Sequence, residues 1–152
     1  MSITRRASLI RKLGTACHVE ARALGLLREV AADRRFDNEV RDRADLHATE
    51  THAQLRWLSA CLTTFGGPDG AWADVAAQPS ERYPSLRAWR TLEHREIQMY
   101  QQLSECAPLA HDRRFLRDCL GALDVQRSVL QWLDRVSPEP ARTLPLFAAG
   151  YA

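Results

Sequence analysis

The sequence predicts an all-α fold, an antiparallel four-helix bundle, on three observations. Long segments carry apolar residues at alternating spacings of three and four, which is the pattern of a helix buried along one side. Glycine and proline clusters separate these segments. A chain of 152 residues with 45% hydrophobic and 26% charged residues has the composition of one soluble domain. We expect the bundle over residues 1–136 and a proline-containing tail over 137–152.

The first two helices are expected over residues 3–32 and 36–65. Because only a short polar turn separates them, they should form an antiparallel hairpin. GGPDG at 66–70 ends the second helix and is the strongest break in the chain. The predicted inner positions are Ile10, Leu13, Cys17, Glu20, Leu24, Leu27 and Ala31 in the first helix, and Val40, Ala44, His47, Thr51, Gln54, Leu58, Cys61 and Phe65 in the second.

A connector follows over residues 66–83, with a helical turn expected over 71–77. A helix of about 30 residues is ~45 Å long, and an 18-residue connector reaches ~60 Å, so the connector can travel the length of the bundle. The third helix is expected over 84–107 with Pro84 in its first turn, and the fourth over 111–136. Their predicted inner positions are Leu86, Trp89, Glu93, Glu96, Ile97, Tyr100, Leu103 and Ala107, then Leu116, Cys119, Leu123, Gln126, Leu130 and Leu133.

Polar residues interrupt the apolar stripes at mid-height. In an antiparallel hairpin, residues at equal distances from the turn lie at the same height. This rule places Glu20 level with Glu50 and near His47 in the first hairpin, and it places Glu93 and Glu96 level with residues 123–126 in the second. Buried ionisable groups are costly unless they are paired or bind a metal. Asp124 is the acid that the fourth helix offers at this level. The predicted ligand set is Glu20, His47, Glu50, Glu93, Glu96 and Asp124.

Carboxylates with imidazole, projecting from facing helices, are the ligands that hold two iron or manganese ions in helix bundles. His47 and Glu50 are three residues apart, as are Glu93 and Glu96, so each pair can face inward together. The order of the first pair, HxxE, is the reverse of the usual ExxH. We expect one or two iron or manganese ions, and we keep as the alternative a metal-free layer held by hydrogen bonds.

Two motifs resemble those of the YciE/YciF-type ferritin-like stress proteins: HATETHAQL at 47–55 and LEHREIQMYQQL at 92–103, with Val19-Glu20 in the first helix. The resemblance implies a ferritin-like bundle with a long crossover between its second and third helices, a homodimer, and a role in bacterial stress responses. Members similar to this chain carry an acidic run in the fourth helix. Here Gly121-Ala122-Leu123 stands in its place, so a two-metal site would lack one ligand.

Charge and cysteine placement narrow the function classes further. The formal net charge is only +2 and the arginines are scattered among acids, so we expect neither nucleic acid nor a membrane as partner. The four cysteines are far apart, as expected of reduced thiols in a cytoplasmic protein. No export signal, Ser-His-Asp arrangement, glycine-rich phosphate loop or zinc knuckle is evident in the sequence. The two remaining hypotheses are a metal-binding bundle and a metal-free dimeric scaffold.

Overall fold

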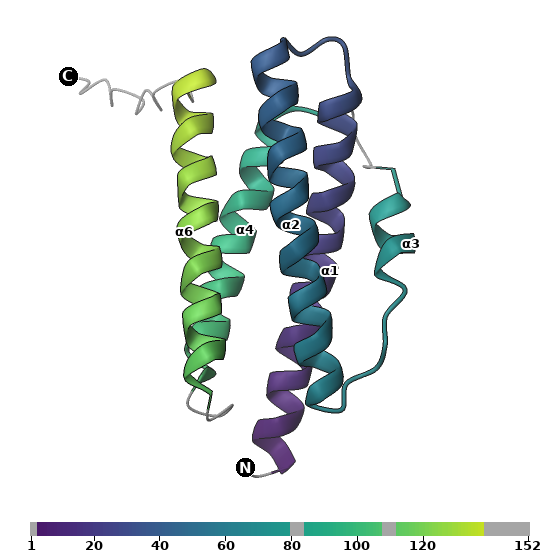
Figure 1. The fold of residues 1–152 in the computed structure, drawn as a ribbon, viewed down its shortest axis with the longest axis vertical. Helices are drawn as coiled ribbons and strands as arrows, with labels where there is room; N and C mark the ends of the chain where they lie inside the picture. Colours follow the sequence, from purple (N-terminus) through teal and green to yellow (C-terminus); the bar gives the residue numbers. More distant parts are fainter. Residues whose placement is uncertain (1–2, 80–83, 108–111, 139–152) are drawn as a thin grey trace, which may run out of the picture.

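The computed structural model describes residues 3–79, 84–107 and 112–138, and within them all regular structure is helical. Helices α1 (Ile3–Ala32) and α2 (Asn38–Thr64) form one antiparallel hairpin, and α4 (Leu86–Ser104) and α6 (Arg113–Val136) form another (Figure 1). The predicted all-α fold is confirmed. The predicted tail lies outside the described residues from 139 onward.

A connector joins the two hairpins, and its described part, residues 66–79, lies along the outside of α1 (Figure 1). This connector contains the short helix α3 (Trp72–Ala77), where a helical turn was predicted. In Figure 1, α2 ends at one end of the bundle and α4 begins at the other, so these two helices run in the same direction. None of the helices in the described part of the chain is long and apolar enough to cross a membrane.

Side-chain caps explain where the helices begin. Asp37, Ser85 and Asp112 each accept a hydrogen bond from a backbone N–H in the first turn of the helix that follows. The prediction that Pro84 lies in the first helical turn is therefore wrong, because Ser85 is the cap. At the other end of α2, Gly66 has φ +79° and its N–H donates to Thr63 O at 2.9 Å.

The core is aliphatic at both ends of the bundle: Leu13 and Leu58 at one end and Leu27 and Leu133 at the other are at most 1% exposed. One predicted inner position on α6 is wrong. Leu116 is 37% exposed, and its neighbour Phe115 is buried instead, in ring contact with Trp57 of α2 at a centroid distance of 5.6 Å.

Close contacts fix α3 against α1 and fix α4 against the end of α6. The backbone of α3 approaches α1 at Gly25, where a Cβ atom would lie 2.6 Å from Ala76 O. Arg90, which is buried, links α4 to the carboxyl end of α6 by donating to Leu133 O at 3.1 Å and to Ser137 O, and by pairing with Asp134 at 3.2 Å. An arginine at this end of a helix satisfies carbonyl groups that have no partner within the helix.

Candidate metal centre

Four ionisable side chains from three helices are buried in the middle of the bundle. Glu20 of α1, His47 of α2, and Glu93 and Glu96 of α4 are each 0–1% exposed. All four were predicted to share this level. Each occupies a position where the apolar stripe of its helix would otherwise place an aliphatic side chain, so the bundle buries acid groups in its centre at a considerable cost in free energy.

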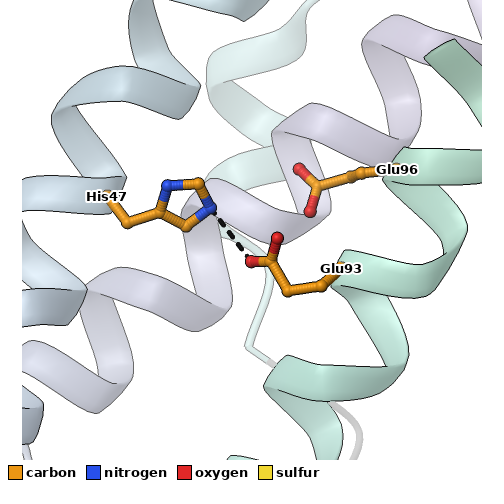
Figure 2. A group of neighbouring side chains, drawn as sticks. All are labelled: His47, Glu93 and Glu96. Atoms are coloured by element: carbon orange, nitrogen blue, oxygen red, sulfur yellow. Dashed lines mark ion pairs between the residues drawn. The ribbon is translucent and has the colours of Figure 1, made fainter. Parts of the chain in front are cut away.

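Three of these side chains converge. Figure 2 shows the imidazole of His47 and the carboxyl groups of Glu93 and Glu96 pointing toward one another from α2 and α4. One ligand atom from each lies within 4.8 Å of the others. His47 Nε2 is 2.9 Å from Glu93 Oε1, but the contact is an ion pair rather than an aligned hydrogen bond. The ligand atoms are therefore one imidazole nitrogen and several carboxylate oxygens, which are the ligands preferred by iron, manganese and zinc.

Glu50 lies on the other side of the imidazole. Its Oε2 is 2.8 Å from His47 Nδ1, and its side chain is 34% exposed. Glu50 thus contacts the ring nitrogen that faces away from Glu93. A carboxylate on one imidazole nitrogen fixes the ring orientation and leaves the second nitrogen to bind a cation. The structure therefore places Glu50 as the partner of His47 and outside the three-residue cluster.

Trp89 also belongs to this group, although the sequence suggested only a packing role for it. Its indole Nε1 donates to Glu93 Oε1 at 2.7 Å. Its ring stacks on His47 with a centroid distance of 6.2 Å and an interplanar angle of 16°. The four-residue spacing between Trp89 and Glu93 was a usable signal for this bond, because side chains at i and i+4 are neighbours on a helix.

Glu20 extends the cluster toward α1. The hydroxyl of Tyr100 donates to Glu20 Oε1, and the carboxyl groups of Glu20 and Glu96 are close enough to perturb each other's pKa. Burial raises the pKa of Glu20 to about 7, although the bonds from Tyr100 and Glu96 act in the opposite direction. Burial and the nearby charges of Glu20 and Glu93 raise the pKa of Glu96 well above its ordinary value. Burial also raises the pKa of Tyr100.

Several carboxylate oxygens of this group have no donor among the described residues. They are Glu20 Oε2, Glu93 Oε2 and both oxygens of Glu96. Two ionised carboxylates offer only acceptors, so the contact between Glu20 and Glu96 is a hydrogen bond only when one of them holds a proton. Buried oxygens in this state need either protons or a cation.

His47 carries the compensating charge when no cation is bound. Burial disfavours the charged imidazolium, but the contacts with Glu50 and Glu93 outweigh it and raise the pKa of His47 to about 9. The same contact with His47 lowers the pKa of Glu50. A bound cation would replace a proton on Nε2, because a histidine ligand must present a neutral nitrogen.

Helix α6 contributes no carboxylate to this level within its described residues. The expectation that Asp124 joins the site is wrong: its side chain is 82% exposed and lies 4.0 Å from Arg127. Leu123 and Gln126 face inward instead. Gln126 donates to Gln54 Oε1 at 3.2 Å, while its own Oε1 is buried without a partner. Thr51 Oγ1 is also buried and, like Gln126 Oε1, has no hydrogen-bond partner in the described part of the chain.

The fold and site thus define a helical bundle with an acidic, histidine-containing core. A crystal structure of a protein from Xanthomonas campestris pv. campestris has a similar fold, with a TM-score of 0.72 and 23% identity over 86% of this chain and 90% of that one. At this identity the similarity concerns the fold alone. No family model and no curated protein matches the sequence.

Proposed function

We propose that this chain is a ferritin-like metal-binding protein that holds iron or manganese in the middle of its bundle. The observation that carries the proposal is the convergence of His47, Glu93 and Glu96 in the core with carboxylate oxygens that lack donors. By the motifs at 47–55 and 92–103 we assign it to the YciE/YciF-type family of bacterial stress proteins, acting in the cytoplasm.

The residues present suit such an ion. His47 Nε2, Glu93 and Glu96 supply one nitrogen and up to four oxygens, and Glu20 adds a further carboxylate at the edge of the cluster. Iron or manganese bound there would supply one-electron chemistry with dioxygen or peroxide. The protein residues orient the ligands: Glu50 holds His47, Trp89 holds Glu93, and Tyr100 holds Glu20.

We favour one ion over two. A two-metal site in a bundle uses carboxylates from all four helices. Here α6 presents Leu123 and Gln126 at this level, and its acid Asp124 faces solvent. The ligand atoms supplied by α1, α2 and α4 would be enough for one ion.

Metal content per chain tests the proposal. The protein should be expressed with iron and manganese supplied, purified without chelators, and analysed by elemental mass spectrometry. We expect close to one equivalent in the wild type and a loss of most of it in Glu93→Gln. Asp124→Asn is the matched control, since it removes an exposed carboxylate and should retain the metal. Wild-type protein without iron or manganese contradicts the proposal.

The alternative is a metal-free scaffold, and one feature of the core favours it. His47 already lies between two carboxylates, and Tyr100 already donates to Glu20, so protons could stabilise much of the layer. In that case adding Fe(II) or Mn(II) to chelator-treated protein leaves its melting temperature unchanged. A metal-binding protein shows a rise, because a cation that binds only the folded state stabilises it.

We also propose a homodimer. The resemblance to the YciE/YciF-type proteins supports this proposal, and Leu46 of α2 and Leu120 of α6, which are 51% and 48% exposed, are apolar side chains that an interface could cover. Size-exclusion chromatography with light scattering gives the mass directly. We expect twice the chain mass for the wild type and a monomer for Leu120→Arg. A wild-type monomer rules out the dimer without affecting the metal proposal.

A further inference from the structure

A second site lies where α3 packs against the first hairpin, formed by α1 and α2. It is a pocket of about 310 Å³ bounded by α1, α2 and α3. Its apolar walls come from Leu24, Leu55 and Ala76, which are 3–6% exposed. A volume of this size, mostly apolar with a few polar groups, is typical of small-molecule sites.

The polar groups of this pocket are nearly all hydrogen-bond donors. Arg28 of α1 and Arg56 and His52 of α2 line it, and no acid is among its described lining residues. Both arginines are exposed rather than packed. Each guanidinium offers five N–H donors and stays charged at any physiological pH. The pocket therefore combines an apolar interior with positive charge at its edge.

Trp72 of α3 also lines the pocket. Its indole Nε1 is buried and has no hydrogen-bond partner among the described residues, so the polar contacts available to a ligand come from the other lining residues. The hydroxyl of Ser59, which also lines the pocket, can donate or accept.

The wall that α3 provides is held in a defined position. Ala76 packs against Gly25, Arg22 donates to Gln78 O at 3.3 Å just beyond α3, and Ala76 is buried. The pocket is thus a feature of the packed crossover and does not depend on the metal centre. None of its lining residues belongs to the cluster of His47, Glu93 and Glu96.

We propose that this pocket binds a small organic carboxylate with an apolar body, such as a medium-chain fatty acid. The apolar body would lie on Leu24, Leu55 and Ala76, and the carboxylate would accept from Arg28 or Arg56 at the edge of the pocket. Both ends of such a ligand match the pocket: the chain replaces water on apolar walls, and the anion meets arginines and no acid among the described lining residues.

Calorimetry and thermal shift with octanoate test this proposal on the full-length protein. We expect octanoate to bind and to raise the melting temperature, whereas 1-octanol and octylamine, which have the same chain without the negative charge, should bind much more weakly. Inorganic phosphate is the control for an anion that has no apolar body, and we expect it not to bind. Equal binding of octanol and octanoate, or no binding of octanoate at millimolar concentration, overturns the proposal.

Variants locate the site. Arg28→Gln and Arg56→Gln remove one charge each, and at least one of them should weaken octanoate binding about tenfold. Arg11→Gln is the matched control, because Arg11 is an exposed α1 arginine that lines a different groove. If Arg11→Gln weakens binding as much as the pocket variants, or if neither pocket arginine matters, the proposed site is wrong.

A filling variant provides a test that leaves the charges unchanged. Ala73 is exposed on α3 and lines the pocket, so Ala73→Phe should block it while the circular dichroism spectrum and metal content stay those of the wild type. Retained octanoate binding in this variant contradicts the proposal. Because metal content is measured separately, failure here does not affect the proposed metal centre, and the reverse also holds.

Discussion

His47 Nδ1 lies 2.8 Å from Glu50 Oε2, while the Nε2 atom of the same ring lies 2.9 Å from Glu93 Oε1. The imidazole is thus held from outside by a half-exposed carboxylate and turned inward toward the acid cluster. In the proposed metal centre this relationship gives the HxxE pair a role different from that of two adjacent ligands: His47 would bind the ion, and Glu50 would orient and polarise the imidazole.

Glu50→Gln should weaken metal binding without abolishing it. The amide oxygen can still accept from His47 Nδ1, but without the negative charge the ring becomes a poorer ligand, and loss of such a partner typically costs ~10–100-fold in metal affinity. Competition with a chelator of known affinity measures the change. Glu39→Gln, near the start of the same helix, should bind metal as the wild type does. Complete loss of metal in Glu50→Gln would instead indicate that Glu50 is itself a ligand.

Glu96→Gln should have opposite effects on stability and on metal binding. The substitution removes a carboxyl group that is fully buried beside Glu20 and Glu93, so the metal-free protein should gain about 1–3 kcal/mol in free energy of unfolding at pH 8. The metal content should fall. Urea unfolding of chelator-treated protein gives the first quantity and elemental analysis the second. Glu105→Gln is the control, because Glu105 is the exposed residue that caps the end of α4. It should change neither the free energy of unfolding nor the metal content by a comparable amount.

The stability of the metal-free protein should fall as pH rises. The pKa of Glu20 is raised from 4.5 to about 7, so the stabilisation from its protonated form is complete below pH 4.5 and is lost as pH rises through about 7. The pKa of His47 is raised from 6.5 to about 9, so the stabilisation from its charged form is complete below 6.5 and lost through about 9.

The check is the melting temperature of chelator-treated protein across this pH range. With Mn(II) present the trend should weaken or reverse, because protons and the cation compete for the same atoms. A melting temperature of the chelator-treated protein that rises steadily from pH 5 to pH 9 would contradict both the burial of Glu20 and the pairing of His47.

Gly25→Ala should destabilise the protein although alanine favours helices. The added Cβ would lie 2.6 Å from Ala76 O, so the backbone of α3 must move, at a cost of about 1–3 kcal/mol. Gly14→Ala on the same helix is the control. A Cβ there meets nothing within 4 Å, so this change should stabilise by about 0.5–1 kcal/mol. Equal effects of the two substitutions, measured by urea unfolding, would show that α3 does not pack closely on α1.

The helices and the polar level were predictable because they depend on local rules. Three sequence features depend on residues near one another in sequence: apolar residues at spacings of three and four, the GGPDG break, and the short turn after the first helix. The helices that they predicted agree with the structure to within a few residues. The level of Glu20, His47, Glu93 and Glu96 followed from reflecting each hairpin about its turn. The choice of the ferritin-like class and of the metal remains a proposal.

The details of the site depended on rotation about each helix axis, which sequence spacing determines only coarsely. One residue along a helix turns the side chain by about 100°, so Asp124 faces solvent while Leu123 is buried. For the same reason the sequence predicted Leu116 as the inner residue, whereas Phe115 is the one that is buried. The sequence by itself determined that the bundle carries a buried acidic level. Only the packing of α1, α2 and α4 decided which atoms meet there, because each contact joins helices that are distant in sequence and whose rotations are set by the whole core.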